Sequence, residues 1–163
     1  MNRAEVVKIR RGTVGDARLL CDLVGAVQEL HLAARPDFFK PYVVTPEMVN
    51  AFKVQLTDAN TYVYIGEVNG EAIGYILAQL VNRPENPYIY ERQYLHIDQM
   101  AVNPEYRSKG CGERLMQQVF DLARSLGVQT VTLNVWAFNQ RAIAFYERQG
   151  FTVRDMRMEA HLE

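Results

Sequence analysis

Apolar side chains recur at helical spacing in the first third of the chain. Between Val14 and Leu32 they return every three or four residues, which predicts an amphipathic helix. Two prolines in residues 34–42 (ARPDFFKPY) rule out its continuation, and a second short helix is expected from Pro46 to about Leu56, with Thr45 as its N-cap. A short strand is expected before both helices, over Val6–Thr13.

The period then changes from about 3.6 residues to two, which is typical of strands. β-Branched and aromatic residues fill 61–68 and 72–81, and Asn69-Gly70 between them is a strong signal for a β-hairpin. A loop with two prolines over residues 82–92 should project from the sheet. Residues 93–102 (QYLHIDQMAV) form the next expected strand, because an Asn-Pro dipeptide stops them.

Helices and strands alternate in the last third of the chain. The apolar stripe after Gly112 predicts a helix to about Leu126, with Gly127 in the position of a C′ glycine. Residues 128–136 alternate as a strand, residues 139–150 predict a short helix closed by a glycine, and residues 151–162 supply one or two final strands. The order β, α, α, β, β, β, α, β, α, β, β indicates an α/β protein, an α+β mixed sheet with helices on its faces.

Composition narrows the function classes. A chain of 163 residues with 48% apolar and 23% charged residues is most economically one soluble globular domain. Its net charge of -1 offers no global field for nucleic acid, so any anion site must be local. No apolar run approaches the roughly 18 residues of a membrane span. Cys21 and Cys111 fit no metal spacing, so we expect no metal site and a reducing, cytoplasmic setting.

The stretch YRSKGCGERL, residues 106–115, raises the question of a phosphate site. A P-loop would need Lys-Ser or Lys-Thr after the second glycine, and a dinucleotide fingerprint would need a third glycine where Leu115 stands, so both are excluded. What remains is a set of backbone N–H groups from residues 108–113 at the positive end of a helix, which suits a pyrophosphate. The alternative is that Gly110 and Gly112 only shape a loop, with the neighbouring cations in solvent.

Two separate blocks of the sequence resemble the GNAT-type N-acetyltransferase superfamily. The block MAVNPEYRSKGCGERLM contains Arg107–Gly112 and is similar to motif A of that family, whose core is [R/Q]-x-x-G-x-[G/A]. The block LNVWAFNQRAIAFYERQGF resembles motif B. It matches motif B at Leu133, Val135, Asn139, Ala142, Phe145, Tyr146, Gly150 and Phe151. With the order of elements, the resemblance extends over nearly the whole chain.

The resemblance implies a single N-acetyltransferase domain over residues 1–163 with the GNAT fold, a six- to seven-stranded splayed mixed sheet flanked by about four helices. It also implies acetyl-CoA as donor, CoA as product and no metal. The pyrophosphate would lie on the backbone of residues 107–113, and the pantetheine arm would pair with residues 100–102 like an added strand. The implied cofactor contacts are Met100, Ala101, Val102, Arg107, Ser108, Lys109, Gly110, Cys111, Gly112, Glu113, Asn139, Ala142 and Tyr146.

The resemblance also implies catalytic roles. Tyr146 matches the family tyrosine that faces the cofactor sulfur and protonates the leaving thiolate; the alternative is a core aromatic. His96 and Asp98 are two apart on one expected strand and should share a face, about where family members carry a Glu or His base. His96 has the intrinsic pKa nearer neutrality, about 6.5, whereas Asp98 would need its pKa raised. The alternative is a structural pair beside a β-bulge. Cys111, between the glycines, is interpreted as filler.

The acceptor stays open among primary amines: a peptide or protein N-terminus, a lysine-like amine or a small-molecule amine. Family members build its site from the first two helices and the loop between the third and fourth strands. In this chain those regions offer His31, Phe38, Phe39, Tyr42, Tyr88 and Tyr90 as walls, and Asp37, Glu85 and Glu91 as groups that attract a cation. The alternative is that the loop aromatics pack on the core or at a homodimer contact.

The expected function is therefore acetyl transfer by direct attack within a ternary complex, because no residue looks placed for a covalent acyl-enzyme. The rival is a non-catalytic acyl-CoA-binding or regulatory module of the same fold. The presence of Tyr146 and Asn139 at their motif positions argues against that rival.

Overall fold

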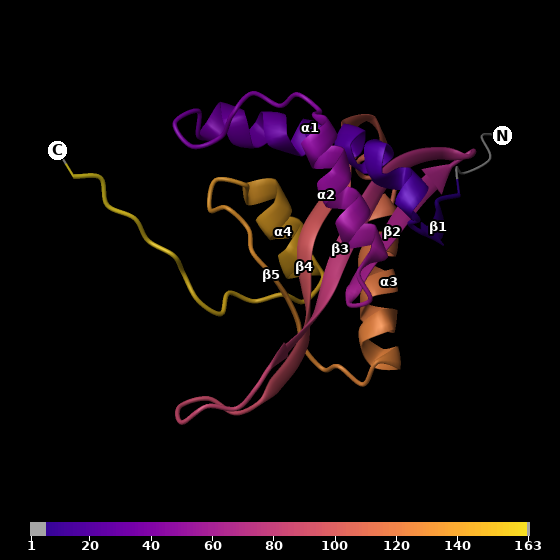
Figure 1. Cartoon of the computed structure of the whole chain (residues 1–163). Helices are drawn as coiled ribbons and strands as arrows, with labels where there is room; N and C mark the ends of the chain where they lie inside the picture. The colour runs from indigo at the N-terminus through magenta and orange to yellow at the C-terminus, as the bar shows by residue number, and fades with distance from the viewer. Residues whose placement is uncertain (1–5, 163) are drawn as a thin grey trace.

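A five-stranded sheet forms the centre of the structure, a computed structural model that describes residues 6–162 (Figure 1). Its strands lie in chain order, and the first four are antiparallel neighbours, whereas the last two are parallel. The strands are β1 (Lys8–Arg11), β2 (Thr61–Val68), β3 (Glu71–Arg83), β4 (Arg92–Val102) and β5 (Val131–Leu133). The mixed sheet with flanking helices predicted from the sequence is confirmed.

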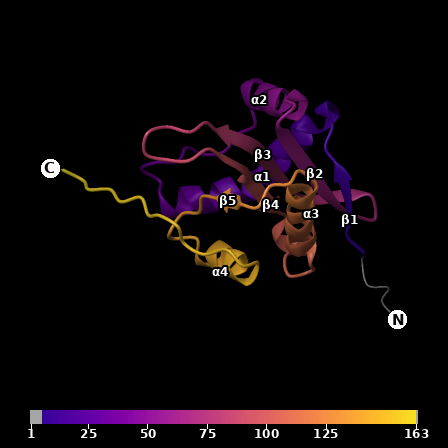
Figure 2. The same cartoon turned by 90° about the horizontal axis from the view of Figure 1, so that it is seen from below.

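Two helices cover each face of the sheet (Figure 2). Helices α1 (Ala17–Ala34) and α2 (Pro46–Thr57) pack on one face, and α3 (Cys111–Ser125) and α4 (Gln140–Arg148) on the other. Short 3-10 turns over Val14–Asp16 and Pro104–Tyr106, η1 and η2, precede α1 and α3. Each pair of helices encloses its own apolar core against the sheet, so the sheet is buried on both faces.

Capping and turn residues behave as the sequence predicts. The Thr45 hydroxyl accepts a hydrogen bond from the Met48 N–H at 3.3 Å, as an N-cap does. Gly127 has a φ of 69° after α3, and the Val128 N–H donates to the Ala123 carbonyl at 2.8 Å, which completes a Schellman motif. The turn at Asn69-Gly70, with φ values of 52° and 84°, joins β2 to β3.

A β-bulge interrupts β4 where the candidate site begins. Gln99 pairs with Leu77 and Ile97 pairs with Ala78, so Asp98 between them has no partner on β3. The extra residue reverses the alternation of side chains along the strand. Ile97 packs in the core beneath α3, whereas Ala101, four residues later, packs in the core beneath α1 and α2.

Strands β4 and β5 separate soon after they meet. Their pairing covers only Leu95–Ile97 on β4 and Val131–Leu133 on β5. The sequence predicts a longer strand over residues 128–136, but residues 134–136 leave the sheet and line a cleft instead. The sheet is therefore splayed beyond the bulge, as the family resemblance implies.

The end of the chain departs from the prediction. Residues 151–162, expected as one or two strands, form no strand, so the sheet has five strands instead of six or seven. The physical reason is that a strand needs a hydrogen-bonded neighbour, and residues 152–162 make no backbone hydrogen bond within the described part of the chain. By contrast, the loop between β3 and β4 projects as a long hairpin, as predicted. No helix within residues 6–162 is long and apolar enough to span a bilayer.

Candidate active site

A cleft of about 900 Å³ lies where β4 and β5 diverge. One side of it consists of β4 from Ile97 to Val102, the start of α3 and the inner face of α4. The other side consists of the C-terminal half of α1, residues 40–42 and part of α2. Since β5 pairs with β4 only as far as Ile97, alternate amide groups of β4 beyond the bulge face the cleft without a strand partner among the described residues.

The backbone before α3 is shaped for a close approach. Ser108 and Gly110 have φ values of 63° and 82°, and a Cβ on Gly110 would meet nothing within 4 Å, so this glycine serves backbone conformation. A Cβ on Gly112, by contrast, would lie 3.2 Å from Phe145 Cζ and 3.3 Å from Met100 Cε. Gly112 therefore lets the first turn of α3 approach both α4 and β4, and it lines the cleft itself.

Two arginines place positive charge at this end of the cleft. Arg107 and Arg141 both line it, and neither has a carboxylate partner among the described residues. Burial lowers the pKa of Arg107, and the nearby Arg141 guanidinium lowers it further. Two like charges beside the N-terminus of α3 fit an anion such as a pyrophosphate. Arg141 was missed from the sequence, because it lies in a motif B position that the motif leaves open.

The other residues of the segment 108–113 differ in whether they line the cleft. Cys111 is 1% exposed and packs beneath β2, where a Cβ on Gly66 would lie 2.8 Å from its sulfur. Burial raises the pKa of the Cys111 thiol to about 11, which fits the interpretation as filler. Lys109 Nζ lies 4.9 Å from the centre of the Tyr106 ring and does not line the cleft. Ser108 and Glu113 do line it.

Helix α4 presents Asn139, Ala142 and Tyr146 to the cleft. Asn139 is its N-cap, with its side-chain oxygen accepting a hydrogen bond from the Ala142 N–H at 3.2 Å. The Tyr146 ring is held between Phe145 and Phe151, with centroids 5.5 and 5.8 Å away. Burial raises the pKa of Tyr146, so its hydroxyl keeps its proton at neutral pH.

The structure separates the two candidate bases. Asp98, on the bulge, is exposed and lines the cleft. His96 is not among the lining residues; its Nδ1 makes a 2.9 Å hydrogen bond with the Thr132 hydroxyl on β5. Gln99 also lines the cleft, and its side-chain oxygen accepts a 2.6 Å hydrogen bond from the Tyr75 hydroxyl. In a regular strand Gln99 and Asp98 would lie on opposite faces of the sheet, whereas the bulge at Asp98 lets both line the cleft.

Aromatic rings gather on the opposite side of the cleft. The aromatic group consists of His31, Phe38, Phe39, Trp136 and Phe138. Trp136 contacts three of the rings, with centroid distances of 5.3 Å to Phe38, 5.4 Å to Phe39 and 5.6 Å to Phe138. His31 stacks on Phe39 at 4.9 Å, its Nδ1 is buried without a partner among residues 6–162, and burial lowers its pKa. His31 and Trp136 line the cleft.

Of the other residues expected on the acceptor side, one lines the cleft and five do not. Tyr42 lines the cleft and donates its hydroxyl hydrogen to the Cys21 carbonyl at 2.7 Å. Tyr88 and Tyr90 stand on the projecting hairpin, 94% and 85% exposed, and line no part of the cleft. The cleft lining also lacks Asp37, Glu85 and Glu91. Asp37 forms an ion pair with Arg35 at 2.8 Å. Trp136 and Phe138 were not singled out from the sequence.

Comparison of the sequence with known proteins identifies a family. The family model described as "Acetyltransferase (GNAT) family" matches residues 27–151. The N-acetyltransferase YhfO of Bacillus subtilis is 27% identical over 146 residues, which are 89% of each chain. The N-acetyltransferase MJ1207 of Methanocaldococcus jannaschii is 31% identical over 93 residues, 57% of this chain, and the match spans only 40% of that longer relative.

Solved structures share the fold over almost the full length. A single-site mutant of the BH1408 protein from Bacillus halodurans has a TM-score of 0.89 at 25% identity, covering 96% of this chain and 99% of that one. An aminoglycoside N-acetyltransferase, AAC(6')-Iy, in complex with CoA, has a TM-score of 0.77 at 14% identity, covering 99% and 98%. The family model covers well over half of the chain, so this protein belongs to the acetyltransferase (GNAT) family.

Proposed function

We propose that this protein transfers an acetyl group from acetyl-CoA to a primary amine by direct attack within a ternary complex. The observation that carries the proposal is the splayed opening beyond the bulge at Asp98, where the unpaired side of β4 leads directly to the start of α3. A ligand with an extended arm that ends in a pyrophosphate would fit this opening. Tyr146 lines the same cleft, beside the path such an arm would take.

The donor would be held mainly by backbone. Residues 100–102 would pair with the pantetheine arm, and residues 107–113 would surround the pyrophosphate with N–H groups. Arg107 and Arg141 would supply the balancing charge. Asn139 and Ala142 would border the arm on the side of α4. The side-chain oxygen of Asn139 already caps the helix, so its side-chain N–H groups would make the contact with the arm.

Tyr146 is proposed as the proton donor to the leaving sulfur. When bound, acetyl-CoA supplies an activated thioester, whose sulfur needs a proton as it leaves. A general acid must still carry its proton at the working pH, and burial secures this by raising the pKa of Tyr146. A thiol has a pKa near 8.5, so an unprotonated thiolate is also a tolerable leaving group. Loss of the hydroxyl should therefore slow the reaction without abolishing it.

Asp98 is proposed to receive the proton of the attacking amine, directly or through water, because it is exposed in the cleft whereas His96 is not. The need for a base depends on the acceptor. At pH 7 a lysine amine is free to about one part in 2,500, and an α-amine to roughly one part in seven. A weak base is therefore sufficient for an α-amine acceptor. The solved CoA complex is named for aminoglycosides, so small polyamines belong in the same panel of acceptors.

A CoA-release assay over peptide N-termini, lysine peptides and small-molecule amines tests the proposal. We expect acetyl-CoA-dependent thiol release with at least one amine, and a product heavier by one acetyl group. Tyr146→Phe serves as the matched variant, because it removes one hydroxyl and leaves the ring contacts with Phe145 and Phe151. Acetyl-CoA binding without turnover on any amine would instead indicate the non-catalytic binding module.

A further inference from the structure

The charged side chains of the cleft are unevenly divided between its two sides. Among the described residues, the carboxylates that line it are Asp98 and Glu113, and the cations are Lys40, Arg107, Arg141 and Arg148. Glu113 lies in the first turn of α3, on the side of the proposed pyrophosphate site. Within residues 6–162, Asp98 is therefore the one carboxylate left for the acceptor side, and it is the group to which we assign the proton of the amine.

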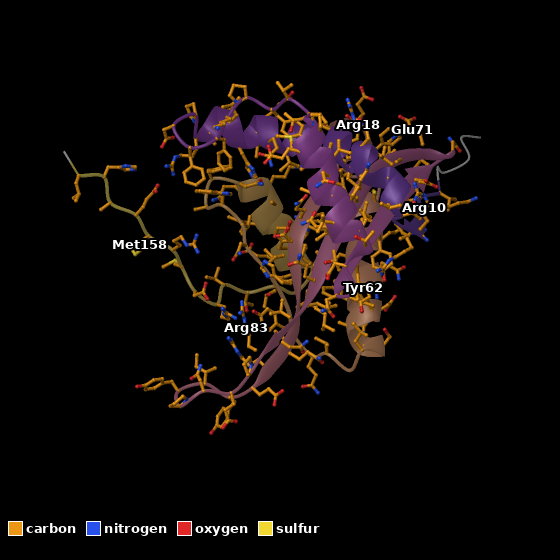
Figure 3. All side chains as sticks on the ribbon, in the orientation of Figure 1. Arg10, Arg18, Tyr62, Glu71, Arg83 and Met158 are labelled. Atoms are coloured by element: carbon orange, nitrogen blue, oxygen red, sulfur yellow. The ribbon has the colours of Figure 1, made fainter. Side chains whose placement is uncertain are left out.

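Two carboxylates beside the aromatic group are already engaged. Asp37 and Glu159 form ion pairs with Arg35, at 2.8 and 2.6 Å, and neither lines the cleft. The acidic residues of the hairpin between β3 and β4 do not line it either, and Figure 3 shows the chain beyond Arg83 running away from α1 and α2. A second cation on the acceptor would therefore find no carboxylate on this wall within the described part of the chain.

The polar groups of the same wall suit a cation poorly. Lys40 can only donate hydrogen bonds, and it has no carboxylate partner among residues 6–162. The Gln99 side-chain oxygen accepts from the Tyr75 hydroxyl at 2.6 Å, which leaves its N–H groups for the cleft. The remaining polar side chains that α1 and α2 contribute, apart from a histidine, are the uncharged amides of Gln28 and Gln55. These groups would not offset the cost of taking a second ammonium group out of water.

Rings and aliphatic side chains form the rest of the wall. Trp136 lines the cleft and is held by three other rings, with centroid distances between 5.3 and 5.6 Å. His31 lines it as well, and burial lowers its pKa, so that ring is neutral at pH 7. Val27 on α1 and Met48 on α2 continue the apolar surface. A wall of this kind favours a flat apolar group over a strongly hydrated one.

We propose that the acceptor carries one primary amine on an apolar, aromatic body and has no second positive charge. The inference rests on the proposed function, because it assigns the substrate of the same cleft. The amine lies at Asp98, and the body packs against Trp136. Arylalkylamines and peptides with an aromatic first residue share this chemistry. Polyamines and aminoglycosides, by contrast, carry further charges for which the wall offers no carboxylate among residues 6–162.

Short peptides that differ only in their first residue test this preference. Each is an amide of the form X-Gly-Ser-Gly in which X is Phe, Ser or Arg, and Arg adds a positive charge without a second primary amine. We expect kcat/KM to be at least about tenfold higher for the Phe peptide than for the Ser peptide, and about 100-fold higher than for the Arg peptide. Equal values for the Phe peptide and either of the others overturn the proposal.

A pair of small molecules distinguishes the two sources of this chemistry. The pair consists of 2-phenylethylamine, which has one amine on an aromatic body, and 1,4-diaminobutane, which has a second charge instead. We expect 2-phenylethylamine to react at least about tenfold faster than the diamine, and an equal or faster diamine overturns the proposal. Whichever of 2-phenylethylamine and the Phe peptide has the higher kcat/KM shows whether the acceptor is a small molecule or a peptide.

Binding can be measured apart from turnover, because Trp136 is the only tryptophan of the chain and lines the cleft. Its fluorescence is followed while each peptide is added in the presence of CoA. We expect the Kd of the Phe peptide to be at least about tenfold lower than that of the Arg peptide. Binding of the Phe peptide with this preference but without turnover would contradict the proposed function and support the acceptor class. Equal Kd values, or no binding of any peptide, overturn the acceptor class even in an active enzyme.

A matched pair of variants tests whether the missing carboxylate sets the preference. Gln28→Glu adds a carboxylate to the wall, and Gln129→Glu makes the same change at an exposed position outside the cleft lining. We expect Gln28→Glu to strengthen binding of the Arg peptide relative to the Phe peptide at least about tenfold, because the new charge attracts the guanidinium. Gln129→Glu should leave the two Kd values unchanged. An unchanged ratio in Gln28→Glu contradicts the proposal, provided that thermal melts show both variants folded.

Discussion

The two halves of the cleft differ in the groups that form their walls, which are mainly backbone in one half and side chains in the other. One half, which we propose binds the donor and call the donor half, consists mainly of backbone: the bulge at Asp98, the unpaired side of β4 and the turn of positive φ at Gly110 before α3. The other half, which we propose binds the acceptor and call the acceptor half, consists of side chains: His31 and Trp136 line it, and the other rings of the aromatic group pack against them. Among the titratable groups that line this cleft, Tyr146 and Asp98 are the two to which we assign proton transfer.

This difference explains what each half can specify. A backbone site recognises an extended arm and a pyrophosphate whatever the surrounding side chains are, so related chains can keep one donor while they diverge. A site made of rings changes with each substitution, so acceptors can differ between relatives of the same fold. Changes in the two halves should therefore have separable effects on the KM values of donor and acceptor.

The largest expected effect is on the donor half. Gly110→Glu should raise the KM for acetyl-CoA about 100-fold, because it puts a carboxylate where the pyrophosphate would lie. Gly127→Glu is the matched control, since that glycine also has a positive φ and open space around its Cβ position. Both variants should lose about 1 kcal/mol of stability from backbone strain. Steady-state kinetics and thermal melts separate the two effects; an unchanged KM in Gly110→Glu would place the pyrophosphate elsewhere.

The next effect is on the chemical step. Tyr146→Phe should lower kcat about 10- to 100-fold and leave both KM values nearly unchanged, since only the proton donor is lost. Because burial raises the pKa of Tyr146 above its ordinary value, the wild-type rate should show no loss from its ionisation across the neutral range. A kcat equal to wild type across the pH range would leave Tyr146 as a core aromatic.

A smaller effect is expected on the acceptor half. Trp136→Ala removes a ring that contacts three others and should raise the acceptor KM about three- to tenfold, with the acetyl-CoA KM unchanged. Tyr88→Ala, which removes a ring that is 94% exposed on the hairpin, is the control and should change neither. A change in the acetyl-CoA KM alone would assign Trp136 to the donor half and contradict the division of the cleft into two halves.

The smallest effect concerns His31 and pH. Its pKa is lowered in the folded chain by burial, so the unfolded chain binds more protons below about pH 6.5 and stability falls as the pH drops through that value. The loss should stay below about 1 kcal/mol, because the ring is partly solvated. His31→Phe should remove this part of the pH dependence, measured by thermal unfolding at pH 7.5 and pH 5. An identical pH dependence in both proteins would show that His31 is not desolvated.

Local features of the fold were predictable because their causes are local. Thr45 caps α2, Asn69-Gly70 turns a hairpin and Gly127 ends α3 through conformations that each residue type favours by itself. The turn before α3 shares this property, since Gly110, with its positive φ, directly precedes the first residue of that helix.

Features that depend on contacts between distant segments were not predictable. An alternating pattern put His96 and Asp98 on one face, but the bulge, which only the pairing with β3 reveals, separates them. Trp136 and Phe138 join the aromatic group only because β5 ends early and the chain turns toward α1. The strands predicted after Phe151 are wrong, because residues 152–162 make no backbone hydrogen bond within the described part of the chain.

Hydrogen exchange with and without acetyl-CoA tests the central claim most directly, because it reports on the two halves of the cleft separately. The account predicts slower exchange in residues 99–113, where β4 and the start of α3 would take up the donor, and little change in residues 31–42 of the acceptor half. Protection of residues 31–42 with none in residues 99–113 would contradict it.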